Sequence, residues 1–91
     1  PDRFVLKQNY PNPFNPATKI RFSIPQSNIG GSTILSVFDV TGSNVKEISY
    51  GKLPPGEYEV DFVASDLTSG VYFYRVSSGA FSETRRMVLL K

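Results

Sequence analysis

Residues 66–72 read Asp66-Leu67-Thr68-Ser69-Gly70-Val71-Tyr72, the segment of this 91-residue chain that points most directly to an architecture. It has the form of a tyrosine corner, in which a tyrosine near the start of a late strand bonds to backbone a few residues upstream. Asp66 stands at the start of the corner, Gly70 supplies its backbone conformation, and Tyr72 supplies the hydrogen bond. Because such corners mark immunoglobulin-like sandwiches, the segment predicts that architecture.

Alternating polar and apolar residues on both sides of the corner predict short strands. Residues 57–62 are the cleanest case, with Tyr58, Val60 and Phe62 on one face, and residues 19–24 follow the same pattern up to Pro25. Further strands are expected over residues 33–40, 45–50, 71–77 and 81–91, joined by turns at 27–32, 41–44, 51–56, 64–70 and 78–80. No window shows helical periodicity. We therefore predict an all-β fold, an immunoglobulin-like antiparallel β-sandwich of about seven strands.

Two strands raise questions about their inward faces. Residues 33–40 place Leu35 and Val37 on one face and three apolar residues on the other, Ile34, Phe38 and Val40. Both faces could therefore be covered, and the inward one stays open. In residues 71–77, by contrast, Tyr72, Tyr74 and Val76 share a single face, which predicts that this face is buried.

Residues 8–16 read QNYPNPFNP and form a second distinctive segment. Its three prolines fix three φ angles and remove three backbone donors, so it is neither a helix nor a central strand. We expect Tyr10 and Phe14 to pin it onto the core, and a cis bond is expected most readily at Tyr10–Pro11. The chain is then one domain, with a proline-rich lead-in over residues 1–17 and the sandwich over residues 18–91.

The composition argues against several classes of function. The formal charge is +2 with basic residues spread along the chain, which does not favour nucleic-acid binding. The chain also lacks an apolar run of about 18 residues, so membrane insertion is not predicted. The chain has no Cys and no His, so it lacks disulfides, the commonest general base and the commonest transition-metal ligand. We expect no enzyme, cofactor or metal site. The acidic residues considered as calcium ligands or as an acid–base pair are Asp39, Glu57, Glu59, Asp61 and Asp66; of these, Asp39 and Asp66 are expected to cap backbone amides.

Several blocks together resemble a known family. They are residues 6–16 (LKQNYPNPFNP) with Thr18, Ile20, Phe22, Ile24 and Pro25, then residues 35–42 (LSVFDVTG), 56–58 (GEY), 67–74 (LTSGVYFY) and 85–91 (RRMVLLK). The chain resembles the type A C-terminal sorting domain of the type IX secretion system over nearly its whole length. The later blocks are similar also to the immunoglobulin-like domain of flagellar hook-capping proteins.

The resemblance implies a non-catalytic secretion signal at the C-terminus of a larger protein. Such domains are read by an outer-membrane translocon, and many are then cleaved off by a sorting protease. The parent would pass through the periplasm and end outside the cell or on its surface. The start at Pro1 without Met suggests a piece of a longer protein, and the end at Lys91 fits a natural C-terminus. The alternative is an immunoglobulin-like structural or carbohydrate-binding module appended to an extracellular enzyme.

Two regions are candidate sites. The sorting candidates lie in the last strand: Arg85, Arg86, Met87, Val88, Leu89, Leu90 and Lys91. This segment is either an ordinary edge strand, with Met87 and Leu89 or Val88 and Leu90 buried, or an edge that a receptor extends through unpaired backbone groups. The structural motif comprises Tyr10, Pro11, Asn12, Pro13, Phe14, Asn15 and Pro16, together with Asp66, Gly70 and Tyr72. The proline segment could be a rigid cap, a recognition element, or both.

Overall fold

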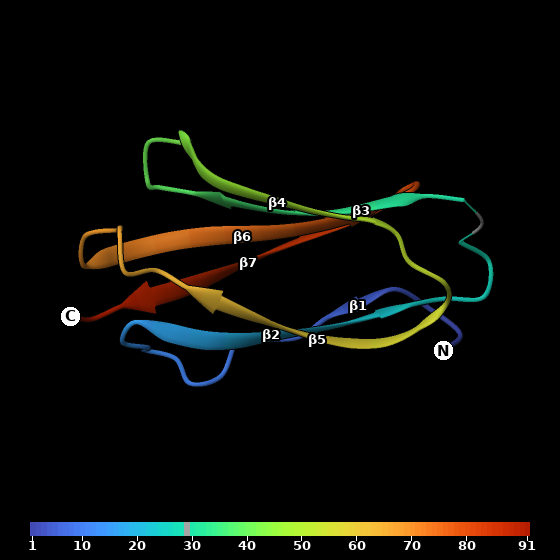
Figure 1. The fold of residues 1–91 in the computed structure, drawn as a ribbon, viewed down its shortest axis with the longest axis horizontal. Coiled ribbons are helices and arrows are strands. Elements are labelled where there is room, and N and C mark those ends of the chain that lie inside the picture. Colours follow the sequence, from blue (N-terminus) through green and yellow to red (C-terminus); the bar gives the residue numbers. More distant parts are fainter. Residues whose placement is uncertain (29) are drawn as a thin grey trace.

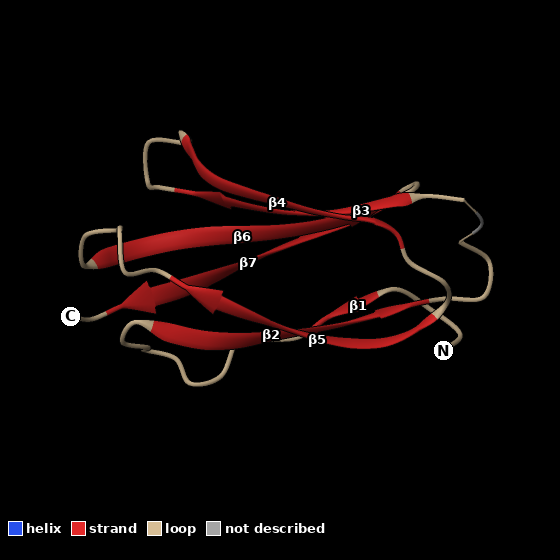
Figure 2. Cartoon of the chain, in the orientation of Figure 1, coloured by secondary structure: helices blue, strands red, loops and turns tan. Residues whose placement is uncertain are grey.

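The computed structural model describes residues 1–28 and 30–91, so residue 29 of the loop expected at 27–32 lies outside the described part. The described residues form seven strands and no helix (Figure 2). The strands are β1 (Val5–Leu6), β2 (Ala17–Ile24), β3 (Ser32–Phe38), β4 (Asn44–Lys52), β5 (Gly56–Val63), β6 (Gly70–Ser78) and β7 (Phe81–Leu89). The predicted all-β fold is confirmed.

The strands form two antiparallel sheets that pack face to face. Sheet A has the order β1-β2-β5, and sheet B has the order β4-β3-β6-β7. Figure 1 shows the two sheets as separate layers, with the chain termini at opposite ends of the long axis. The architecture is thus a β-sandwich, in which β1 and β5 are the edges of one sheet and β4 and β7 the edges of the other.

The core lies between the sheets and follows the alternation in the sequence. On β2 every second residue from Thr18 to Ile24 is buried, and on β6 the residues Tyr72, Tyr74 and Val76 are buried as predicted. The open question about β3 is resolved, because Leu35 and Val37 face the core. The core therefore consists mainly of the apolar half of each alternating strand.

The strands differ from the prediction in one unpredicted strand and in several of their bounds. The two-residue strand β1 was not predicted, because two residues are too few to show alternation. β3 ends at Phe38, since the Asp39 carboxylate accepts hydrogen bonds from the Thr41 and Ser43 amides and starts a turn there. Gly42 completes this turn with a φ of 87°, as predicted for the hairpin. β7 ends at Leu89, two residues earlier than predicted.

Candidate functional site

The lead-in crosses from sheet A to the edge of sheet B. Tyr10 exchanges two backbone hydrogen bonds with Lys19 of β2, at 3.1 and 3.0 Å. Four residues later, Phe14 forms an isolated parallel bridge with Leu89 of β7. The three X–Pro bonds of residues 8–16 are all cis, at Tyr10–Pro11, Asn12–Pro13 and Asn15–Pro16. The lead-in therefore contacts both β2, near the start of the chain, and β7, near its end.

The outer edge of β7 is occupied by this lead-in. The Asn12 Oδ1 accepts a hydrogen bond from the Val88 N–H at 2.9 Å. The Phe14 N–H donates to the Val88 carbonyl at 3.0 Å, and the Phe14 carbonyl accepts from the Leu90 N–H at 3.0 Å. We call these contacts of Asn12 and Phe14 with Val88 and Leu90 the edge clasp. It satisfies backbone groups that an edge strand would otherwise present to a partner.

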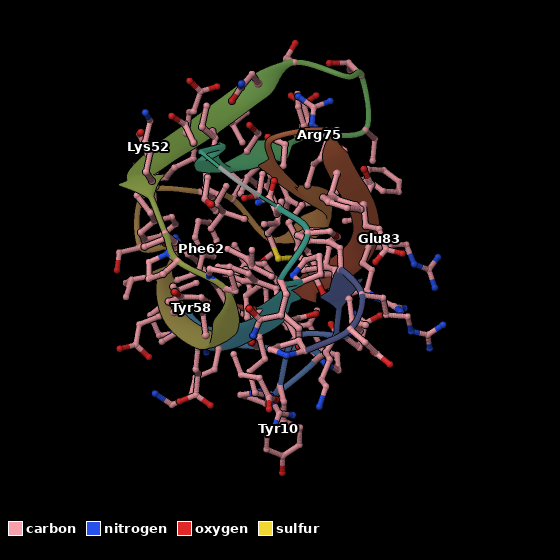
Figure 3. The ribbon with its side chains drawn as sticks, turned by 90° about the vertical axis from the view of Figure 1, so that its right-hand side faces the viewer. Tyr10, Lys52, Tyr58, Phe62, Arg75 and Glu83 are labelled. Carbon is pink, nitrogen blue, oxygen red and sulfur yellow. The ribbon has the colours of Figure 1, made fainter. Side chains whose placement is uncertain are left out.

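The two aromatic residues of the lead-in behave differently. Phe14 is 2% exposed, and its ring lies edge-on to the Phe62 ring at a centroid distance of 6.3 Å, so its predicted pinning role is confirmed. The prediction for Tyr10 is wrong, because its side chain is 74% exposed and projects away from the fold (Figure 3). Tyr10 is paired with Lys19, and residues opposite each other in an antiparallel pair share a face. Since Lys19 is on the outer face of sheet A, Tyr10 is too.

Asn9 anchors the lead-in from inside. Its buried side-chain amide donates to the Thr18 Oγ1 at 3.1 Å and to the Pro11 carbonyl at 3.2 Å. The Asn9 backbone N–H donates to the Tyr74 hydroxyl at 2.8 Å, and that hydroxyl donates to the Lys7 carbonyl at 2.7 Å. Burial raises the pKa of the Tyr74 hydroxyl. No local sequence pattern indicates this contact, because Asn9 and Tyr74 are 65 positions apart.

The remaining lead-in residues are less enclosed. Pro13 and Asn15 are exposed, and Pro16 is half-buried. The Pro16 carbonyl accepts a hydrogen bond from the Ala64 N–H at 2.8 Å, which fixes the start of β2 against the end of β5. The lead-in is thus held near both of its ends, at Tyr10 and at Pro16, which is consistent with a rigid cap.

The alternation of β7 separates its core residues from its surface residues. Met87 and Leu89 are fully buried, so the first of the two predicted burial patterns is confirmed. The side chains of Arg86 and Val88 consequently face outward from sheet B. Leu90, just beyond the strand, is 55% exposed.

The basic residues at the C-terminal end have distinct surroundings. The Arg85 Nε donates to the Leu6 carbonyl at 2.6 Å, and the Leu6 N–H donates to the Glu83 Oε2 at 3.0 Å, so Arg85 and Glu83 join β7 to β1. The Lys91 Nζ donates to the Ser65 carbonyl at 2.6 Å. For Arg86, no side-chain hydrogen bond or ion pair is formed within the described part of the chain; its carbonyl accepts from the Gln8 amide at 2.6 Å.

The tyrosine corner is present. The Tyr72 hydroxyl donates to the Thr68 carbonyl at 2.7 Å, which confirms the predicted bond to upstream backbone. Gly70 opens β6 with a φ of 157°, a conformation that side chains rarely adopt. The Asp66 carboxylate also pairs with the Lys46 Nζ at 3.2 Å, a partner that the sequence did not predict. This contact lowers the pKa of Asp66.

The comparison with protein families identifies the chain. The model of the secretion system C-terminal sorting domain matches residues 8–90, from the lead-in through the end of β7. The chain belongs to that family. The resemblance found in the sequence is therefore confirmed. The sorting domain serves as a C-terminal signal for type IX secretion. Membership implies interaction with the secretion machinery, attachment to a cargo, and export to the cell surface or the extracellular space. No curated protein matches the chain.

The acidic residues of the sorting domain are dispersed. Asp61 and Glu59 pair with Lys19 at 2.6 and 3.8 Å on the outer face of sheet A, far along the chain from the Asp39 turn. The hydrogen bond from the Thr41 side chain lowers the pKa of Asp39. Residues 1–28 and 30–91 contain no group of three acidic, Cys or His side chains that could hold a metal ion. They also contain no helix that is long and apolar enough to cross a membrane.

Proposed function

We propose that residues 1–91 are a non-catalytic signal whose outward side chains at the C-terminal end are read by the type IX translocon. One observation carries this proposal. Of the seven residues 85–91, only Arg86, Val88 and Leu90 direct side chains outward without being held by the rest of the fold. The others fill the core, join β7 to β1, or join the C-terminus to the corner. These three side chains are therefore the ones available to a receptor.

Recognition by strand addition at this end of β7 is disfavoured by the edge clasp. A partner strand would have to displace three hydrogen bonds worth about 1 kcal/mol each and expose Phe14, whose burial is worth about 2–3 kcal/mol. An opening cost of about 5 kcal/mol leaves roughly one molecule in several thousand open, since each 1.4 kcal/mol is a factor of ten. Reading the side chains requires no such opening.

The remaining parts of the proposal concern the route of export. The cargo is joined at the N-terminal side of the lead-in and passes through the periplasm with the folded domain. The translocon moves it to the cell surface or the medium, and a sorting protease then separates domain and cargo. The domain needs no catalytic group of its own for any of these steps.

The test is an export assay in a bacterium that has this pathway. Residues 1–91 are fused to the C-terminus of a periplasmic fluorescent protein, and the exported fraction is measured. We expect the fusion to leave the cell and the folded variant Val88→Ser/Leu90→Ser to be retained. The control Ser82→Ala/Thr84→Ala changes exposed residues elsewhere on β7 and should be exported. Retention of the unchanged fusion in folded form contradicts the proposal.

Tyr10 supports a second candidate, a carbohydrate-binding module. Its exposed ring borders a shallow hollow of about 380 Å³ that also includes Pro11, Lys19 and Asp61. An exposed aromatic face beside a charged donor and acceptor is an arrangement that can stack on and hydrogen-bond a sugar ring. Retention of the isolated domain on insoluble polysaccharide, lost in Tyr10→Ala, would favour this function. Equal elution of both proteins would exclude it.

A further inference from the structure

A row of three residues crosses the outer face of sheet B. Phe38 of β3 lies directly opposite Phe73 of β6, and Phe73 lies opposite Arg86 of β7. Arg75, two residues along β6, places its guanidinium carbon 4.8 Å from the centre of the Phe38 ring. Figure 3 shows Arg75 on the side of sheet B away from the core residue Phe62. We call Phe38, Phe73, Arg75 and Arg86 the arginine–phenylalanine patch.

The patch leaves apolar surface and charge accessible together. Phe73 is 36% exposed although it is aromatic, Phe38 is half-buried, and both arginines are exposed. Val71 and Val88, also half-buried, lie opposite each other beside the row and extend its apolar part. Aromatic residues and arginine are the types enriched at the centres of protein–protein interfaces. The composition of the patch is therefore that of a docking surface.

The charges of the patch are not neutralised by the domain itself. Ion pairs in the described part of the chain involve Lys19 and Lys46 and neither patch arginine. Glu47 of β4 lies on the same face, but Ser36 of β3 stands between it and Arg75 in the register. The Glu47 carboxylate accepts a hydrogen bond from the Asn44 side chain at 3.2 Å. Both guanidinium groups thus remain available to an external acid.

We propose that the arginine–phenylalanine patch docks an acidic protein surface of the secretion machinery. The proposal rests on the function proposed above and extends its reading surface from β7 across β6 to β3, with Arg86 in both. Arginine binds carboxylates bidentately, and the neighbouring rings give the partner apolar surface to cover. A lipid surface is the poorer fit, because anionic membranes are recognised by clusters of about four to eight basic residues, and this patch has two.

The experiment uses the same fluorescent fusion and paired charge reversals. We expect Arg75→Glu/Arg86→Glu to lower the exported fraction by about tenfold, the loss typical of a central charged contact. Arg75→Lys/Arg86→Lys keeps the charge and should retain part of the export. The control Arg3→Glu/Lys52→Glu has the same net charge as the reversed variant but changes residues at the other end of the sandwich. It should be exported like the unchanged fusion.

Stability is controlled in parallel, because Arg75 stacks on Phe38. If Arg75→Glu/Arg86→Glu does not fold, the variant Phe73→Ser/Arg86→Glu leaves that stacked pair intact and carries the same expectation. Full export of a folded patch variant, with the unchanged fusion also exported, overturns the patch and leaves the proposed function standing. Retention of the unchanged fusion overturns the proposed function itself.

A binding measurement separates a protein partner from a lipid one. The ¹⁵N-labelled chain is titrated with a glutamate-rich peptide containing aromatic residues, and separately with phosphatidylglycerol vesicles. We expect the peptide to shift the amides of the four patch residues, and added salt to weaken the effect. Shifts caused by the vesicles alone, shifts confined to another face, or no shifts with the peptide would each contradict an acidic protein partner.

Discussion

Truncation of Phe14 tests whether the lead-in belongs to the folded core. The ring is 2% exposed and packs against Phe62, while the backbone of the same residue bonds to Val88 and Leu90. Replacing a buried phenylalanine by alanine typically costs about 3–5 kcal/mol, from lost transfer free energy and the cavity left behind. Small domains have total unfolding free energies of about 5–15 kcal/mol, so Phe14→Ala should remove a large fraction of the stability.

The assay is urea unfolding followed by tyrosine fluorescence, with Tyr10→Ala as the matched variant. Tyr10 is four positions away in the same segment but 74% exposed, so its truncation should change the free energy of unfolding by no more than about 0.5 kcal/mol. Phe14→Ala should shift the urea midpoint strongly at an unchanged m-value. In thermal unfolding it should lower Tm by more than about 12 °C, at about 4–8 °C per kcal/mol.

Hydrogen exchange adds a local reading of the same change. The Val88 and Leu90 amides are protected by Asn12 and Phe14, so Phe14→Ala should speed their exchange more than that of the β6 amides. A cost below about 1 kcal/mol for Phe14→Ala, or an equal cost for Tyr10→Ala, would contradict this role of the Phe14 side chain. Either result would mean that the lead-in is held by something other than the Phe14 side chain.

Three further predictions concern hydroxyl and carboxyl groups. Tyr72→Phe removes the 2.7 Å hydrogen bond to the Thr68 carbonyl and should cost about 1 kcal/mol in urea unfolding; an unchanged midpoint would deny the corner a stabilising role. Burial raises the pKa of Tyr74. The contribution of Tyr74 to the free energy of unfolding is therefore complete below its unfolded pKa near 10 and is lost as pH rises through its folded pKa. Tm should therefore fall above pH 10, and it should fall more gently in Tyr74→Phe. Equal slopes of Tm against pH in the two proteins would contradict this role of Tyr74. The Thr41 hydrogen bond lowers the pKa of Asp39. The stability that this carboxylate contributes is therefore present above its unfolded pKa of 3.8 and is lost as pH falls through its folded pKa. Asp39→Asn should flatten the loss of Tm below pH 4, and identical acid profiles would show that the turn carboxylate is not responsible.

Local sequence patterns predicted the features that depend on local rules. Alternation located six of the seven strands, because a sheet with one buried face repeats every two residues. The turn at Gly42 and the corner at Tyr72 were also predicted, since both depend on residues within a few positions of each other. The strand β1 was missed, because the residues Val5–Leu6 are too few to show a period.

The lead-in shows why the rest could not be predicted. Whether an aromatic residue in an extended segment faces the core depends on the strand with which it pairs. Tyr10 pairs with Lys19 and turns outward, whereas Phe14 leaves sheet A and enters the core beside Leu89. The contact between Asn12 and Val88 joins positions 76 residues apart. Such pairings are set by the closed sandwich, and nothing near Tyr10 or Phe14 in the sequence encodes them.

The four sheet edges of the sandwich support one view of how this signal is read. β1 is two residues long, β4 has register shifts opposite Thr33/Ile34 and Val37/Phe38, and β5 alternates acidic residues over 57–61. The C-terminal end of β7 is covered by the edge clasp. Short strands, bulges, charges and covering segments are the ways in which proteins blunt edges against unwanted pairing. Such protection keeps the edges of the sandwich from pairing with other chains. The same protection makes strand addition a costly mode of recognition. It therefore supports the proposal that the secretion machinery reads side chains, among them those of the arginine–phenylalanine patch on sheet B.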